Sequence, residues 1–78
     1  MNLFQFRLLD EIEQIEAVWD SPLLATIEDD DFIYDLHQIH SFYAEVKYRK
    51  PGRTLNRMKT FRNPDLLNPY LDKIKIDL

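Results

Sequence analysis

The first predicted element is a helix near the start of the chain. Leu8, Ile12, Ile15 and Trp19 recur at intervals of four, three and four residues. This spacing places apolar side chains on one face of a helix, and Phe4 extends the stripe backward. Acidic and amide side chains occupy the other faces. We therefore expect one N-terminal helix whose apolar stripe packs into the core.

The limits of this helix follow from polar residues and a proline. Asp10 is a good N-cap residue, so it either caps a shorter helix or lies in the first turn of a longer one. The Asp20-Ser21-Pro22 run ends the helix, because proline disfavours helical geometry at the residue before it. The apolar run at 23–28 is compatible with a strand. The four adjacent carboxylates of Glu28–Asp31 must be solvated, which predicts a loop.

The segment 32–49 fits two hydrophobic periods. Read as a helix, it carries an apolar stripe that includes Phe32, Leu36 and Val46, whereas read as strands it alternates, most regularly after Phe42. Aromatic and β-branched residues dominate here, and such residues favour a pleated surface. The composition therefore predicts two strands with a turn near Ile39–Ser41, and one helix is the alternative.

A hairpin is predicted around Pro51 and Gly52. Proline fixes the backbone at the second position of a type II turn, and glycine accepts the positive φ of the third. The strand 54–62 that follows has a mixed pattern, with Met58 and Thr60 on one face. The opposite face would hold a longer set: Leu55, Arg57, Lys59 and Phe61. This mixture predicts an edge strand or a bulge near Phe61.

The tail repeats one helix-start signal. Asn63-Pro64 and Asn68-Pro69 each place a capping side chain before a proline suited to the first helical position. We expect a short turn at 64–67 and a final helix at 69–75, closing over the sheet. The predicted fold class is α+β, with an N-terminal helix, an antiparallel β-meander of three or four strands and a short C-terminal helix. One small domain is expected over residues 1–78. The expected core consists of Leu8, Ile12, Ile15, Trp19, Phe42, Val46, Met58 and Leu71.

Composition narrows the classes of function. The chain has 78 residues, of which 45% are hydrophobic and 13% aromatic, and this composition is typical of a folded domain. It contains no cysteine, which excludes a disulfide scaffold, a thiol nucleophile and a cysteine-ligated zinc site. No apolar stretch is long enough to span a membrane, and the first residues lack the features of a signal peptide. These features predict a cytoplasmic protein.

Charge is unevenly distributed along the chain. The net charge is −4, yet residues 1–46 hold eleven acidic residues and one basic residue. Residues 47–62 hold seven basic residues and no acidic residue. One interpretation is complementarity within the chain, where each surface pair contributes about 0–1 kcal/mol. The other is a basic surface for nucleic acid or for an acidic partner.

Few residues suit catalysis or metal binding. The single glycine is too few for a glycine-rich phosphate loop. His37 and His40 are three residues apart, so on one strand they point to opposite faces and suit no metal. We therefore expect no catalytic residue, no metal and no cofactor. A ribonuclease-like site that combines either histidine with Arg57 and Lys59 is the one enzymatic alternative left open.

Several motifs resemble a group of small bacterial proteins without assigned function. The likeness rests on Trp19, Leu24-Ala25, Phe61 and two longer runs. These runs are Ser41-Phe42-Tyr43-x-Glu45-Val46-x-Tyr48 and Leu67-x-Pro69-Tyr70-Leu71. The motifs are structural, so the resemblance supports the hairpin and implies no catalytic residue. A fainter likeness is to the last hairpin of RelE-like ribonuclease toxins, in which a Tyr-rich strand precedes a basic strand ending in Phe. This chain lacks the basic helical hairpin of that family and is acidic overall.

The sequence thus predicts a small non-enzymatic protein-interaction or regulatory module, which binds a protein partner or a second copy of itself. The candidate interaction surface consists of Tyr43, Lys47, Arg49, Arg53, Arg57, Lys59 and Arg62. The strand 54–62 is the expected site, because an edge strand offers unpaired backbone groups to a partner strand. The alternative is a nucleic-acid or ribosome-associated protein that uses the basic hairpin 47–62.

Overall fold

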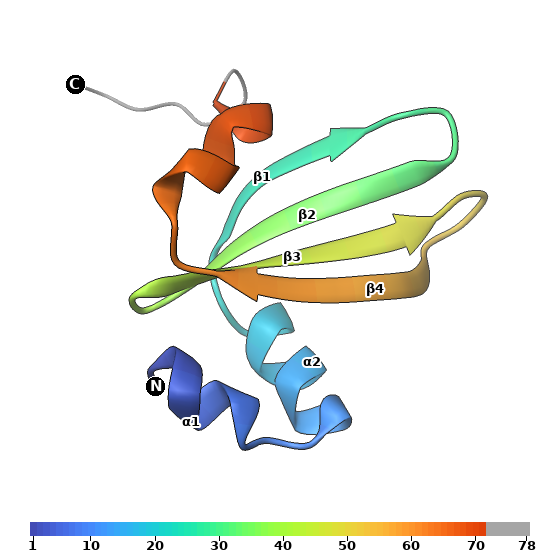
Figure 1. The fold of residues 1–78 in the computed structure, drawn as a ribbon. Helices are drawn as coiled ribbons and strands as arrows, with labels where there is room; N and C mark the ends of the chain where they lie inside the picture. The colour runs from blue at the N-terminus through green and yellow to red at the C-terminus, as the bar shows by residue number, and fades with distance from the viewer. Residues whose placement is uncertain (72–78) are drawn as a thin grey trace.

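The computed structural model describes residues 1–71, and its core element is a four-stranded antiparallel sheet. The elements are α1 (Leu3–Arg7), α2 (Glu11–Trp19), β1 (Leu23–Glu28), β2 (Phe32–Ile39), β3 (Phe42–Arg49), β4 (Thr54–Phe61) and the 3₁₀ helix η1 (Pro64–Tyr70). The two α-helices lie against one face of the sheet and η1 against the other (Figure 1). We call these the helix face and the η1 face. The α+β class and the meander are confirmed.

The N-terminal segment forms two helices rather than one. Asn2 caps α1, and Asp10 caps α2 with a capping box in which Glu13 bonds back to the Asp10 backbone. The cap at Asp10 requires extended backbone there, which ends any continuous helix. The prediction that Asp10 caps a shorter helix is therefore correct, and the prediction of a single helix is wrong.

The face of these helices that enters the core also differs from the prediction. Leu3, Phe6 and Val18 are buried, whereas Leu8 is 73% exposed and Ile12 69% exposed. Trp19, another predicted core residue, is 56% exposed, and Ile15 is half-buried. Ile12, Ile15 and Trp19 all lie in α2, but this helix turns Val18 to the sheet instead of that stripe. The break at Asp10 separates Leu8 from the rest of the stripe.

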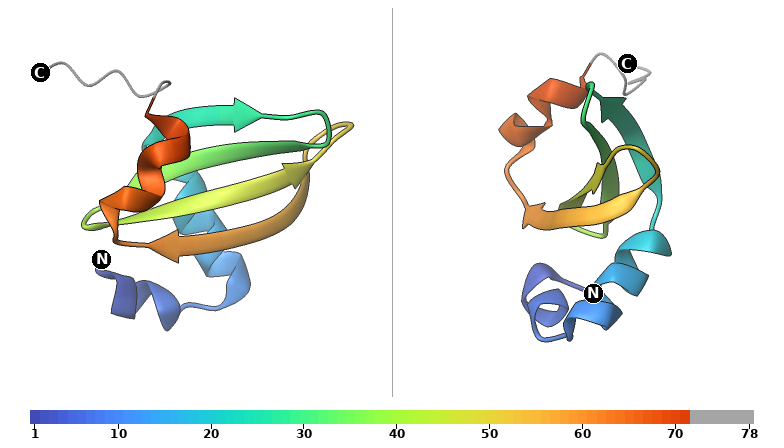
Figure 2. Two further views of the ribbon diagram at one scale, coloured as in Figure 1. Left: turned by 45° about the horizontal axis from the view of Figure 1, so that its top comes forward. Right: turned by 90° about the vertical axis from the view of Figure 1, so that its right-hand side faces the viewer.

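The sheet is a meander in the order β1-β2-β3-β4, so β1 and β4 are its edges. The segment 32–49 is two strands joined by the two-residue turn His40-Ser41, since Ile39 pairs with Phe42. His40 adopts a positive φ of 53° there. The helical alternative for this segment is therefore wrong. The views in Figure 2 show that the sheet is curved and that η1 crosses the ends of the strands.

The hairpin between β3 and β4 lies where Pro51 and Gly52 predict it. Gly52 has the expected positive φ of 76°, and the Lys50–Pro51 peptide bond is cis. The irregularity in β4 is a bulge at Asn56, because Lys47 pairs with Arg57 whereas the next residue of β3 pairs with Leu55. The bulge is therefore not near Phe61. It moves Leu55 to the helix face, away from the face on which the alternation placed it.

Two apolar clusters fill the two sides of the sheet. The cluster on the helix face joins Leu3, Phe6 and Val18 to the alternating residues of β3, including Phe42 and Val46. The rings of Phe6 and Phe42 lie 5.3 Å apart between centroids. Phe42 and Val46 confirm the predicted core, and Met58 packs against it while half-buried. The smaller cluster, on the η1 face, contains Ala25, Leu36, Phe61 and Tyr70.

The tail is one 3₁₀ helix over Pro64–Tyr70 instead of a turn followed by a helix. The Asn63 side chain accepts a hydrogen bond from the backbone of Asp65, as the Asn-Pro pair predicts. Tyr70 closes over the sheet and is fully buried, whereas the predicted core residue Leu71 is 46% exposed. The remainder of the predicted 69–75 helix lies outside the described residues. Within residues 1–71, no helix has the length and apolar character needed to cross a bilayer.

Candidate interaction surface

Strand β4 places two basic side chains at an open edge of the sheet. Arg57 pairs in register with Lys47 and Lys59 with Glu45, so Arg57 and Lys59 both point to the η1 face. Apart from Met58, Thr60 and Phe61, the residues of β4 are exposed. The prediction that the strand lies at an edge is confirmed. Its outer backbone groups have no neighbouring strand in the described part of the chain.

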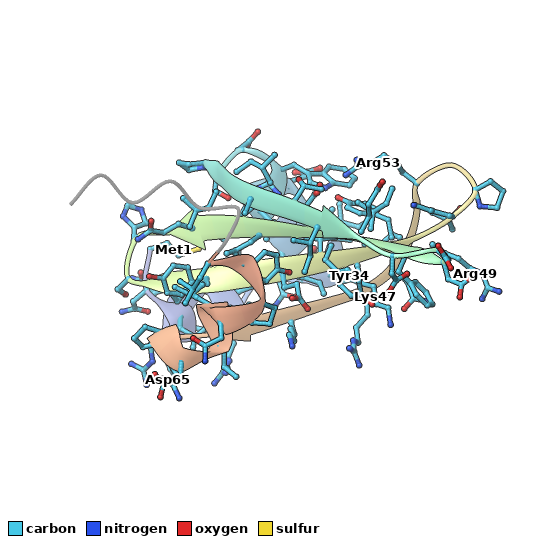
Figure 3. The ribbon with its side chains drawn as sticks, turned by 90° about the horizontal axis from the view of Figure 1, so that it is seen from above. Met1, Tyr34, Lys47, Arg49, Arg53 and Asp65 are labelled. Atoms are coloured by element: carbon cyan, nitrogen blue, oxygen red, sulfur yellow. The ribbon has the colours of Figure 1, made fainter. Side chains whose placement is uncertain are left out.

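The strand register also brings the aromatic rings of Phe32 and Tyr34 beneath the ammonium group of Lys47. Lys47 Nζ lies 3.9 Å from the centroid of the Phe32 ring and 5.6 Å from that of the Tyr34 ring. Figure 3 shows Tyr34 and Lys47 close together, toward the end of the sheet where Arg49 lies. Each cation–π contact contributes about 0.5–1 kcal/mol at an exposed site. The alternation of a strand puts Phe32 and Tyr34 on one face. No residue pattern indicates the register that sets them under Lys47.

Lys59 is part of a polar link between β4 and η1. Its Nζ lies 3.5 Å from Glu45 Oε1, and the Tyr70 hydroxyl donates a hydrogen bond to Glu45 Oε2. Burial, followed by the bond to the Glu45 carboxylate, raises the pKa of Tyr70 far above its usual value. The phenol therefore stays protonated and keeps donating to Glu45. This link fixes η1 over the sheet and sets the position of Lys59.

Three of the seven predicted surface residues lie apart from β4's basic pair. Tyr43 is half-buried and stacks on Phe61, with ring centroids 5.5 Å apart. Arg62 follows the end of β4 and lines a shallow hollow with residues of α1. Arg53 lies on the helix face, apart from Tyr34 and Lys47 (Figure 3). The predicted set is therefore divided. Tyr43, Lys47, Arg49, Arg57 and Lys59 lie on the η1 face, whereas Arg53 lies on the helix face and Arg62 lies beside α1.

Arg53 belongs to a network around a buried carboxylate. It forms an ion pair with Asp35, whose other oxygen accepts a hydrogen bond of 2.8 Å from Thr26 Oγ1. The Arg53 guanidinium also lies 4.5 Å from the centroid of the Tyr48 ring. The Tyr48 hydroxyl accepts a hydrogen bond of 2.9 Å from the Trp19 indole. Arg53 thus stabilises the buried Asp35 and is not free to bind a partner.

The acidic loop also makes contacts within the chain. Lys50 Nζ lies 3.4 Å from Glu28 Oε2 and donates to the backbone carbonyl of Asp29. The Asp29 carboxylate accepts hydrogen bonds from the backbone of Asp31 and Phe32, and these bonds lower its pKa. Internal complementarity therefore accounts for Lys50, Arg53 and Lys59. Within residues 1–71, Arg49 and Arg57 form no ion pair.

A groove separates α2 from β4 on the helix face. It has a volume of about 450 Å³ and a mixed lining. Ile15, Leu55 and Met58 supply the apolar part, and Glu11, Gln14, Asn56 and Arg57 supply the polar part. Ile12 and Trp19 lie beside Ile15 on the helix surface, since residues three and four apart are neighbours. Both are more than half exposed. Of the apolar stripe that the sequence assigned to the core, Ile15 therefore lines this groove, while Ile12 and Trp19 are exposed on α2 next to it.

The two histidines lie at different places in the sheet, His37 on β2 and His40 in the β2–β3 turn. His37 is buried on the helix face, where its Nδ1 donates to the carbonyl of Ser21 at 3.2 Å. Arg57 and Lys59 point to the opposite face, so the ribonuclease-like combination with His37 is not assembled. His40 lies in the β2–β3 turn. Among the described residues, no three His, Asp or Glu side chains are grouped to share a metal ion.

Comparison with protein-family models, with curated proteins and with solved structures found no match to this chain. The candidate surface is defined by its own geometry. It consists of the free edge of β4, the cations Arg57 and Lys59 on one side of that edge, and the α2–β4 groove on the other.

Proposed function

We propose that this protein is a non-enzymatic interaction module that binds an extended, acidic segment of a partner protein along the edge of β4. The observation that carries the proposal is an exposed edge strand with no acidic side chain, on which Arg57 forms no ion pair among residues 1–71 and Lys59, half exposed, lies beside it in its link to Glu45. Added strands bind through main-chain hydrogen bonds, and cross-strand pairs of opposite charge contribute about 0.2–1 kcal/mol each. The lack of cysteine fits a cytoplasmic setting for this binding.

The bulge at Asn56 defines how much of the edge is usable. A bulge disrupts regular pairing, so it protects the part of β4 before Asn56 from adding a strand. Pairing remains regular from Arg57 to Phe61. Those residues are the proposed docking segment, and Arg57 and Lys59 flank its centre.

Charge argues against a second copy as the partner. Antiparallel pairing of β4 with itself would place the cations of one copy beside those of the other, which is unfavourable. The acidic loop is also a poor strand donor, because Glu28 and Asp29 already contact Lys50 and the loop forms a tight turn. We therefore favour a different protein over the self-association that the sequence also allowed.

Nucleic acid is the second candidate, favoured by the cluster of Lys47, Phe32 and Tyr34. Single-stranded nucleic acid binds where bases stack on aromatic rings beside cations. Two observations place it second. Lys47 already lies over Phe32, where a base would stack, and the carboxylates of the acidic loop adjoin this end of the sheet.

A peptide titration followed by NMR tests the proposal. The probe is a nine-residue peptide in which glutamate and valine alternate, and its control replaces each glutamate by lysine. The acidic peptide should shift the backbone amides of Arg57–Phe61, and the basic one should not. Arg57→Glu should abolish this response, while Arg49→Glu, which changes an exposed arginine on an inner strand, should retain it. Oligouridine serves as the nucleic-acid probe. Amide shifts confined to other strands, or shifts caused by oligouridine but not by the acidic peptide, would contradict the proposal.

A further inference from the structure

The α2–β4 groove borders the same edge that the proposed partner strand would extend. Leu55 and Met58 point to the helix face, and Ile15 of α2 lines the groove opposite them. Arg57 and Lys59, which alternate with Met58 and Thr60, point to the other face. The groove lining also includes polar residues, namely Glu11 and Gln14 of α2 and Asn56 and Arg57 of β4. The apolar side chains of Leu55 and Met58 therefore lie on one side of this edge strand, and the basic side chains point to the other.

A strand that pairs with β4 would meet different side chains of β4 on its two faces. Side chains of an added strand alternate between the two faces of the sheet. Those on the helix face would lie beside Leu55 and Met58 and would meet the groove, to which Ile15 contributes an apolar side chain from α2. Those on the η1 face would lie beside Arg57 and Lys59, at the separation of cross-strand neighbours.

We propose that the groove selects apolar side chains at every second position of the bound strand, so that the ligand is a segment in which acidic and apolar residues alternate. This inference rests on the proposed function and adds specificity to it. Among residues 1–71, the charge pattern argues against the edge strands of a second copy as ligands. Strand β4 carries only cations, and the residues of β1 on the η1 face, Ala25 and Ile27, include no acid to meet Arg57.

The groove also offers an explanation for the position of Leu55, which lies on the helix face although it is not part of the buried core. Leu55 is 38% exposed and reaches the helix face only because of the bulge at Asn56. Without the bulge, Leu55 would share the η1 face with Arg57. The bulge thus both shortens the usable edge and supplies an apolar contact at one end of the groove.

The test compares two acidic peptides of identical composition. In one, glutamate and valine alternate; in the other, the valines form one block. The alternating peptide should bind at least about tenfold more tightly, the scale expected for burying an apolar side chain. Leu55→Ser should reduce this preference severalfold. The matched control is Leu66→Ser, which alters an exposed leucine on η1 and should leave the preference unchanged.

The outcomes separate the two proposals. Equal affinity for both peptides, with no effect of Leu55→Ser, would overturn the inference while leaving binding at the β4 edge intact. Failure of both peptides to bind would overturn the proposed function and the inference together. Because Leu55 is partly exposed and Leu66 is its control, a circular dichroism spectrum of each variant identifies any loss of folding before binding is compared.

Discussion

Replacing Arg53 by methionine removes the cation that pairs with the buried carboxylate of Asp35. Methionine keeps most of the apolar stem, so the substitution isolates the charge. The Asp35 side chain is 9% exposed and that of Arg53 is 52% exposed. Breaking a fully buried pair costs about 3–5 kcal/mol, and a hydrogen bond to a charged group contributes about 1.5–3 kcal/mol. Because Arg53 is half exposed, water reaches the pair, and we expect Arg53→Met to cost about 2 kcal/mol.

A second substitution, Asp35→Asn, tests whether Arg53 acts by compensating the charge of Asp35. Asp35→Asn in the native background should destabilise the fold, because Arg53 then faces a neutral amide while Thr26 can still donate to the Asn oxygen. In the Arg53→Met background the same change should be neutral or stabilising, since it removes an unpaired buried charge. The sign of the Asp35→Asn effect should therefore depend on residue 53.

Urea unfolding followed by circular dichroism measures each corner of this cycle. A chain of this size has an m-value of about 1 kcal/mol/M in urea, so Arg53→Met should lower the unfolding midpoint by about 2 M. Thr54→Ser, at an exposed neighbouring position, is the control and should change the midpoint little. A cost below about 0.5 kcal/mol for Arg53→Met, or additive effects of the two substitutions, would refute the reasoning.

Three further predictions concern acidity and the sheet edge. The pKa of Asp29 is lowered in the folded protein, so its carboxylate stabilises the fold above the usual pKa of 3.8, and this stabilisation is lost as pH falls through the folded-state value. Asp29→Ala should therefore flatten the acid limb of a profile of melting temperature against pH, whereas the control Asp30→Ala should not. The pKa of Tyr70 is raised, so the protonated phenol stabilises the fold at pH values below its usual pKa of 10, and this stabilisation is lost as pH rises through the folded-state value. In an ultraviolet titration, Tyr70 should therefore ionise last of the four tyrosines, and its ionisation should coincide with unfolding. Replacing Arg57 and Lys59 together by threonine should produce concentration-dependent association in light scattering, since the cations oppose pairing between exposed edges; a monomer at all concentrations would argue against that role.

The strands were readable from the sequence where local signals agreed with tertiary structure. The alternation after Phe42 and the Pro51-Gly52 turn each fix a local conformation, and both lie where predicted. The predicted helix face is wrong because α2 packs on the sheet through Val18, whereas the more regular stripe of Ile12, Ile15 and Trp19 is partly exposed. Spacing alone does not show that Leu8 and Ile12 lie on opposite sides of the break at Asp10.

The candidate site was less accessible to sequence reasoning than the fold. The edge position of β4 follows from the meander, so its cations could be anticipated. The bulge at Asn56 has no distinctive residue to signal it, yet it decides on which face Leu55 lies. The groove depends on how α2 is oriented relative to β4. The residues next to Ile15 in the sequence do not indicate that orientation. The pairing of Arg53 with Asp35 likewise depends on register across the sheet.

The order of the strands also bears on how quickly the chain folds. Each strand pairs with the strand next to it in sequence, so every hairpin can close without waiting for a distant segment. Chains dominated by such short-range contacts search fewer conformations and fold faster than sheets with crossed connections. The longer loops that must close are those that bring Phe6 onto Phe42 and Tyr70 onto Glu45. We therefore expect these two docking events, rather than the assembly of the sheet, to limit the folding rate.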